Sequence, residues 1–394
     1  MVSPGVTART HTSRRGVVVA ALGTSQTLAW ASSYYLPAIL ADDMANSAGV
    51  PRAWVFAAFS GALLLTAALG PWVGRLIDRR GGRGVLAASN LVFAVGLIAL
   101  GASNGIATQG AAWAVLGVGM ALGLYDAAFA TLAGIYGREA RAPITGITLI
   151  AGFASTIGWP LSALLDAQLG WRGACFVWAA MHIAIALPLN LLLVPRSSGA
   201  AAHGEQAAAS WEPRREMFLL AYVFAAAWFV TGAMAAHLPA LFERLGATTV
   251  QAVAASALVG PAQVAARLAE FVIMRRIHPL VSARIAASMH PIGAAVLAAF
   301  GSPAAAAFAL LHGAGNGLLT IARGTVPLAL FGPINYGART GLLGAPARAA
   351  QAAAPLLFGL LLDAMGAWVL AVSAGLCLSA LAALFLLRAS KTDV

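Results

Sequence analysis

Three arginines interrupt apolar stretches of the sequence and define its most distinctive candidate chemistry. Arg267, Arg323 and Arg348 are each flanked by runs of apolar and small residues. A charge placed in lipid costs about 3 kcal/mol on insertion scales, so these side chains are expected to face a protein interior or a wet cavity. A guanidinium offers a planar set of donors that matches a carboxylate, and two of them can hold a small mono- or dianion. The three residues therefore predict an anion-binding site.

The segments around these arginines carry further polar residues at helical spacing. Residues three or four positions apart lie on one face of a helix, so each set forms one polar stripe. The sets are Asn316, Thr320 and Arg323; Gln263, Arg267 and Glu270; and Arg348 with Gln351. We predict that Asn316 and Gln351 contribute to the anion site together with the arginines.

The early part of the chain supplies an aromatic counterpart. Gln26, Trp30 and Tyr34 recur at a spacing of four residues, close to the 3.6-residue period of a helix, and we predict that they bind substrate. Asp126 is an acid within a central apolar segment. An ionisable group at such a depth marks a functional site by default, so we predict that Asp126 accepts a coupling proton.

The same charged residues also fit a structural alternative. Arg267 can pair with Glu270, and Arg323 with Asp126, as salt bridges that form and break in a gate. In that arrangement Asp126 stays ionised and exchanges no proton. This pairing leaves one arginine over, and Arg348 is the residue that we expect to bind the anion most directly.

The composition shows what kind of element must hold these residues. The chain has 394 residues, of which 60% are hydrophobic and 9% charged, and its mean hydropathy is +0.84. Soluble domains carry roughly 25% charged residues, which excludes an ordinary soluble enzyme. A helix crosses a bilayer with about 17–25 residues, and only helices or closed barrels satisfy their backbone in lipid. We predict twelve helical spans, at 16–40, 54–76, 84–101, 111–136, 144–165, 174–194, 217–242, 250–274, 285–300, 304–330, 341–362 and 367–387.

The basic residues set the predicted orientation. The sequence has 24 Lys and Arg residues and a net charge of +11, and most of them fall in the loops on the N-terminal side of the membrane. Short cytoplasmic loops retain Lys and Arg, so both termini are predicted to be cytoplasmic, in a bacterial inner membrane. The charge thus indicates a lipid-bilayer partner and no nucleic acid. Cys175 and Cys377 form no metal-ligand spacing, and neither a metal nor another cofactor is predicted.

One unit of six helices occurs twice in the sequence. Pro160 follows Gly146 at the same interval at which Pro355 follows Gly341, and Leu-Pro-Ala at 36–38 recurs at 238–240. We predict a tail at 1–15, a first bundle at 16–194, a cytoplasmic linker at 195–216, a second bundle at 217–387 and a tail at 388–394, in a monomer. His182, His290 and His312 are predicted to be packed or interfacial.

The loop after the second span carries a recognisable motif. Its sequence GRLIDRRGGRG contains Gly74, Asp78, Arg79, Gly81 and Arg83. This pattern resembles the signature loop of the major facilitator superfamily. The resemblance implies an all-α membrane protein with twelve transmembrane helices in two pseudo-symmetric six-helix bundles. These residues are predicted to latch the two bundles, since a carboxylate can cap a helix N-terminus and glycine allows close contact. Glu270 is predicted to stand near the equivalent position in the second copy.

A narrower resemblance concerns the substrate. Arg267 and Arg348, with the aromatic first span, are similar to the monocarboxylate porter and oxalate:formate antiporter branch of that superfamily. The resemblance implies a secondary transporter that moves a small organic anion by alternating access, with a proton as the candidate coupling ion. One alternative is an exporter of drugs or hydrophobic cations that uses Asp126 and the aromatic residues. Another is a non-transporting sensor or assembly factor, while no motif predicts an enzyme.

Overall fold

The computed structural model describes residues 4–197 and 215–388, which form helices joined by turns and short loops. Within those residues there is no β-strand, which confirms the predicted all-α fold. The chain divides into two compact units, Met1–Ala207 with Pro333–Gly341, and Ala208–Gly332 with Leu342–Val394. Most of the predicted linker lies outside the described residues, and the predicted bundle and tail boundaries remain predictions.

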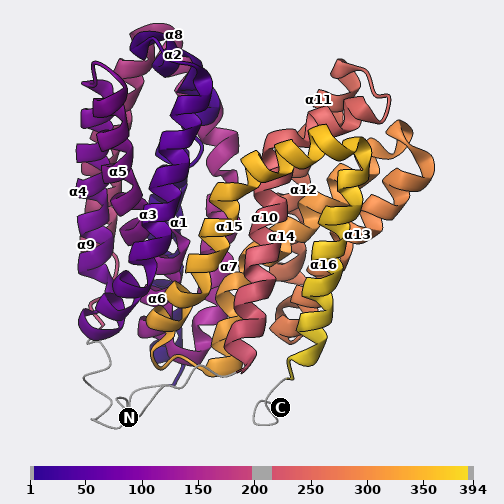
Figure 1. Ribbon diagram of the computed structural model, residues 1–394. Coiled ribbons are helices and arrows are strands. Elements are labelled where there is room, and N and C mark those ends of the chain that lie inside the picture. The colour runs from indigo at the N-terminus through magenta and orange to yellow at the C-terminus, as the bar shows by residue number, and fades with distance from the viewer. Residues whose placement is uncertain (1–3, 198–214, 389–394) are drawn as a thin grey trace. The chain divides into compact units, whose positions relative to one another are not determined.

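The first unit consists of helices that pack side by side (Figure 1). They are α1 (Pro4–Ser32), α2 (Pro37–Ala48), α3 (Arg52–Arg80), α4 (Gly82–Gly101), α5 (Ile106–Gly123), α6 (Tyr125–Tyr136), α7 (Arg141–Ile150), α8 (Ala154–Met181) and α9 (Leu187–Leu192). Helix α5 packs against α3 and α4, and α1 packs against α7 and α8. A π-helical turn, His182–Ala186, joins α8 to α9.

The second unit also consists of helices that pack against one another. Its helices are α10 (Arg215–Arg244), α11 (Thr249–Ala257), α12 (Val259–Val272), α13 (Pro279–Phe300), α14 (Ala305–Phe331), α15 (Tyr336–Met365) and α16 (Val369–Leu386). Helix α14 packs against α12 and α13, and α16 packs against α10 and α13. The first residues of α15, up to Gly341, belong to the first unit.

Several predicted spans are interrupted in the structure. The first helix begins at Pro4 and ends at Ser32, and a turn separates it from α2, which begins at Pro37. Proline at the first helical position favours such a start, because its missing N–H has no helical partner to lose. The predicted span 111–136 is split between α5 and α6 at Leu124, whose backbone is extended (φ −82°, ψ −173°). These breaks differ from the continuous helices that the apolar runs predict.

Eight helical stretches of the described chain are long and apolar enough to cross a membrane. Two of them, Ile106–Leu192 with 87 residues and Tyr336–Leu386 with 51, are longer than one crossing requires. In the first of these, Gly170 adopts a positive φ of 70° and marks a kink between two predicted spans. The count of twelve crossings remains a prediction.

Candidate functional site

The three predicted arginines are buried in the second unit. Arg267 on α12, Arg323 on α14 and Arg348 on α15 are 6%, 5% and 3% exposed. Charged side chains are almost never this buried without compensating contacts. Nη2 of Arg267 lies 3.5 Å from the hydroxyl of Thr320 on α14 and 3.4 Å from Oε1 of Gln263 on its own helix. The stripes predicted on α12 and α14 therefore meet.

Helix α10 contributes contacts that the sequence did not predict. The guanidinium of Arg323 lies 4.8 Å from the ring centroid of Trp228, which is a cation–π geometry. The hydroxyl of Thr231 donates to Oδ1 of Asn316 at 3.2 Å. Trp228 and Thr231 are three residues apart, so one face of α10 holds two members of the α14 stripe. The sequence contains this three-residue spacing, but Trp228 and Thr231 carry no charge, so nothing in the sequence alone marks them as site residues.

The predicted residues of α15 lie next to the same face. The backbone carbonyl of Gln351 would lie 3.1 Å from a Cβ atom at Gly232, which follows Thr231 on α10. Gln351 and Arg348 are three residues apart on α15, and both are buried. Thus α10 contacts residues of α14 and α15 that were predicted to bind the anion.

Glu270 connects two helices of the second unit. It is buried near the end of α12, and its Oε2 accepts a hydrogen bond of 2.8 Å from Ser282 on α13. A hydrogen bond to a carboxylate is stronger than one between neutral groups. This contact ties α12 to α13 within the second unit, and the role of Glu270 in a latch remains a prediction.

The aromatic residues predicted in the first unit form a connected cluster. The ring of Trp30 lies 5.1 Å from Tyr34 and 5.0 Å from Tyr125, between ring centroids. Tyr34 continues the cluster to Phe59 at 5.4 Å. Such edge and tilted contacts are the preferred geometries of aromatic pairs. The cluster joins α1 and the turn that follows it to α3 and α6.

Gln26 connects this cluster to the break in the fourth predicted span. Its Nε2 donates to the carbonyl of Gly123 at 2.6 Å, at the last residue of α5 before Leu124. An interrupted helix leaves carbonyl groups that need partners, and Gln26 provides one. In the described part of the chain, two buried atoms here have no hydrogen-bond partner: Oε1 of Gln26 and Nε1 of Trp30. Asp126 lies in the first turn of α6, directly after the break.

The predicted latch residues meet the start of α15 inside the first unit. The carboxylate of Asp78 accepts hydrogen bonds from the backbone N–H groups of Gly337 at 2.8 Å and Ala338 at 2.7 Å. A Cβ atom at Gly74 would lie 1.9 Å from the carbonyl of Gly337, so only glycine fits. Asp78 therefore caps a helix N-terminus, as the motif implied.

The remaining residues of this motif have different environments. Gly81 has a φ of 77° and ends α3, and a Cβ atom there would lie 2.4 Å from the carbonyl of Ser197. Arg79 is exposed and Arg83 is half-buried. Their part in a latch remains a prediction.

Comparison with known proteins gives the chain its family. A sequence profile described as Major Facilitator Superfamily matches residues 21–311. The chain belongs to the Major Facilitator Superfamily. No curated protein matches its sequence.

Two solved structures of superfamily members illustrate the shared fold. The human organic anion transporter MFSD10 (TETRAN) is 19% identical, with a TM-score of 0.73 over 94% of this chain and 99% of the other. The E. coli fucose:proton symporter FucP is 14% identical, with a TM-score of 0.70 over 94% of this chain and 98% of the other. These likenesses confirm the predicted fold.

Membership of the Major Facilitator Superfamily makes the chain a multi-pass membrane transporter and not an enzyme. A transporter of this superfamily binds a small molecule within a lipid bilayer. The predicted small-molecule and bilayer partners are therefore confirmed at that level. The anionic substrate, the proton and the monomeric state remain predictions.

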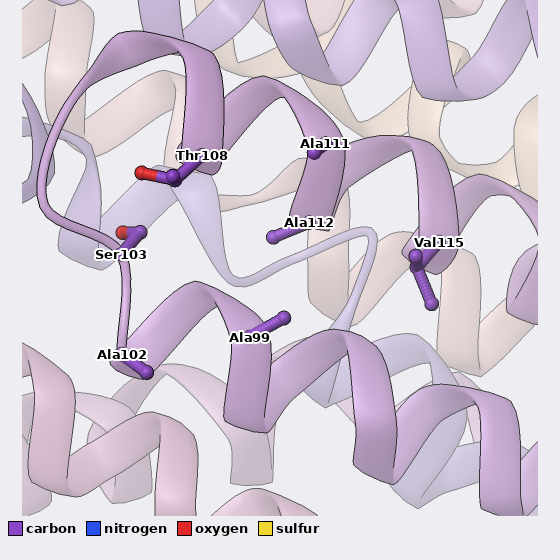
Figure 2. Close-up of a pocket in the computed structure, with 7 residues that line it drawn as sticks. All are labelled: Ala99, Ala102, Ser103, Thr108, Ala111, Ala112 and Val115. Atoms are coloured by element: carbon purple, nitrogen blue, oxygen red, sulfur yellow. The ribbon is translucent and has the colours of Figure 1, made fainter.

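A hollow at one end of the first unit lies away from the predicted residues (Figure 2). It has a volume of about 280 Å³ and lies between the end of α4 and the start of α5. Its lining side chains are small: Ala99, Ala102, Ser103, Thr108, Ala111, Ala112 and Val115. It has neither charge nor aromatic surface, so it offers an organic anion no compensating contact.

Proposed function

We propose that this member of the superfamily is a secondary transporter of a small organic anion, mono- or dicarboxylate-like, coupled to a proton. The observation that carries the proposal is the burial of Arg267, Arg323 and Arg348, each at most 6% exposed, in one unit. Buried cations are favourable where an anion can replace their lost hydration. Three guanidinium groups from three helices suit a ligand with one or two carboxylates.

The contacts of each arginine suggest a division of roles. Trp228 stacks on Arg323 and restricts its guanidinium plane. Thr320 and Gln263 restrict the guanidinium of Arg267 through their neutral side-chain oxygen atoms. A preorganised donor loses less entropy when it binds an anion. In the proposal, Arg348 contacts the carboxylate directly, while Asn316 and Gln351 supply neutral hydrogen bonds.

In the first unit, Gln26, Trp30 and Tyr34 are proposed to bind the uncharged part of the substrate. Oε1 of Gln26 and Nε1 of Trp30 have no hydrogen-bond partner, and this supports the role. A buried acceptor or donor without a hydrogen bond costs free energy, which a bound substrate can recover. A substrate hydroxyl group or a water molecule could satisfy both. The aromatic faces around them favour a planar or apolar substrate body.

The coupling ion and the location complete the proposal. Asp126 is proposed to bind the coupling proton, and the chain is proposed to lie in a bacterial inner membrane with both termini in the cytoplasm. The excess of basic residues in the loops predicted to be cytoplasmic supports that orientation. Two similar folds belong to a human organic anion transporter and to a fucose:proton symporter.

A second function is favoured by the first unit taken alone. Tyr125 stacks on Phe129 at 5.2 Å, and Asp126 lies between them in sequence. Aromatic faces beside a carboxylate attract lipophilic cations. The alternative is therefore an exporter of hydrophobic cations.

Uptake into proteoliposomes tests the proposal directly. The full chain is reconstituted, and uptake of labelled lactate, benzoate and oxalate is compared with efflux of ethidium. We expect carboxylate uptake that falls at least 100-fold in Arg348→Ala while the variant remains monodisperse in detergent. Arg244→Ala, an exposed arginine of the same unit, is the matched control and should transport normally. Normal carboxylate uptake by Arg348→Ala would remove the anion assignment, and ethidium efflux alone would favour the exporter.

The proton is tested through Asp126. Asp126→Asn keeps the shape of the side chain but cannot exchange a proton. We expect it to reduce the accumulation that a pH gradient drives, while exchange of labelled for unlabelled carboxylate at equal pH continues. Unchanged accumulation would show that Asp126 does not bind the coupling proton and would favour the alternative in which it forms a structural ion pair.

A further inference from the structure

Two histidines of the second unit form a buried hydrogen-bonded pair that the proposed anion site does not use. Nδ1 of His290 on α13 lies 3.0 Å from Nδ1 of His312 on α14. Nε2 of His290 lies 3.0 Å from the hydroxyl of Ser373 on α16. The two side chains are 4% and 5% exposed, respectively. The pair therefore joins three helices through titratable groups.

The direction of each hydrogen bond follows from Ser373. Its hydroxyl donates to the carbonyl of Leu370 at 3.0 Å, and a hydroxyl has one hydrogen to donate. Ser373 must then accept from Nε2–H of His290, which leaves Nδ1 of a neutral His290 as an acceptor. His312 must donate to it through its own Nδ1–H. The neutral pair thus has one fixed arrangement of protons.

This arrangement leaves one open position, Nε2 of His312. A neutral imidazole that donates through Nδ1 carries a lone pair on Nε2. Within the described residues, His312 makes no hydrogen bond other than the one to His290. A proton added to the pair therefore has one vacant lone pair to bind.

His312 also continues the polar stripe of α14. It precedes Asn316 by four residues, so it lies on the face that carries Thr320 and Arg323. The open nitrogen thus belongs to the helix face of the proposed anion site. A proton there adds positive charge to that face.

The surroundings of the pair are apolar. Phe308 stacks on His312 at 5.9 Å and meets His290 edge-on at 5.2 Å. Besides the pair itself, the packed helices carry these charged or titratable groups: Arg284 on α13, Arg323 on α14, Arg267 and Glu270 on α12, Cys377 on α16, and Arg215, Glu216, Tyr222, His237, Glu243 and Arg244 on α10. Arg284 is held by the carbonyls of Leu384 and Leu387, and Arg244 by Asp363. Helix α11, which also packs on α14, has no charged residue.

We propose that the His290–His312 pair is a second proton-binding site, which takes up a proton on Nε2 of His312 together with the transported anion. An imidazolium in apolar surroundings is costly unless an anion compensates it, and the arginine stripe places that anion on the same helix. Proton and anion then increase each other's affinity by the same factor. The proton comes from the water on the side where the anion enters and returns to water where the anion leaves.

The test measures how far a pH gradient drives accumulation, and it rests on the proposed anion transport. Proteoliposomes with the membrane potential clamped at zero receive a gradient of one pH unit and labelled lactate, benzoate or oxalate. Each proton that moves with the anion multiplies the accumulation ratio by about ten per pH unit. We expect His312→Gln to accumulate about tenfold less than the wild type and to keep exchange at equal pH. His237→Gln, which changes a half-buried histidine bound to the carbonyl of Pro355, should match the wild type.

The outcomes separate the two proposals. Transport by the wild type with undiminished accumulation in His312→Gln overturns the proton site and leaves the anion transporter intact. Absence of carboxylate transport in the wild type overturns the proposed function and this inference with it. If His312→Gln does not fold, ¹⁵N-histidine NMR of the wild type in detergent decides. Adding the transported carboxylate at constant pH should protonate Nε2 of His312, and an unchanged signal overturns the site.

Discussion

The two units of this superfamily member differ in the hydrogen bonds of their buried histidines. In the first unit, Nε2 of His182 bonds to the hydroxyl of Ser32 at 2.8 Å, and Nδ1 bonds to Oδ1 of Asn90 at 3.0 Å. The amide of Asn90 donates in turn to the carbonyl of Leu86 at 2.8 Å. Both ring nitrogens are therefore occupied by neutral groups, and the network is closed.

The second unit leaves its network open at His312. A buried histidine is therefore not in itself a functional signal, because its hydrogen-bond partners decide whether it can bind a proton. A closed network stabilises a neutral ring and joins helices, here α1, α4 and the π-helical turn. A network with one vacant nitrogen can change its charge.

The greatest loss of stability is expected for a variant of His182 in the first unit. His182→Ala leaves the hydroxyl of Ser32 and Oδ1 of Asn90 without their partner, and each unpaired buried group costs about 1–3 kcal/mol. We expect a loss of about 2–6 kcal/mol in the free energy of unfolding, measured by thermal unfolding in detergent. His312→Ala removes one hydrogen bond from the second unit and should cost less. Equal losses would contradict the contrast between a closed and an open network.

A medium effect is expected for the carboxylate that caps α15. Asp78→Asn removes the charge that accepts from Gly337 and Ala338, and hydrogen bonds to a charged group contribute about 1.5–3 kcal/mol. We expect a lower melting temperature and slower transport, because the start of α15 is held less firmly. Asp78→Glu is the matched control, since it keeps the charge but lengthens the side chain. A melting temperature for Asp78→Asn equal to that of the wild type would show that the cap adds nothing.

The smallest effect is expected at an exposed ion pair of the second unit. Arg244 Nη2 lies 3.0 Å from Oδ1 of Asp363, with side chains 44% and 77% exposed. Exposed pairs contribute about 0–1 kcal/mol, so Asp363→Asn should change the free energy of unfolding by less than that. Thermal unfolding at low and high salt provides the measurement. A larger loss than that of Asp78→Asn would reverse the ranking of buried and exposed charges.

Sequence patterns predicted the helices and much of the polar spacing. Hydrophobic runs gave the elements because lipid leaves backbone groups no other partner. The stripe of Asn316, Thr320 and Arg323 follows from the period of a helix, and the structure connects it to α10 and α12. Local spacing thus predicted which residues share a face.

Contacts between helices could not be predicted in the same way. Trp228 and Thr231 look like ordinary helix residues until α14 is placed beside them. The histidine pair joins positions 22 residues apart, and nothing in either segment specifies a common register. The break at Leu124 is likewise absent from the hydropathy pattern, because an extended leucine is as apolar as a helical one.

That break has a consequence for hydrogen–deuterium exchange. Helical amides deep in a membrane exchange slowly, since their donors are occupied and solvent is scarce. At Leu124 the helical ladder stops, and its first bonds afterwards are those from Ala127 and Ala128 to the carbonyl of Leu124. Peptides that cover this joint should therefore take up deuterium earlier than those one turn to either side, and their uptake reports on water that reaches this part of the first unit.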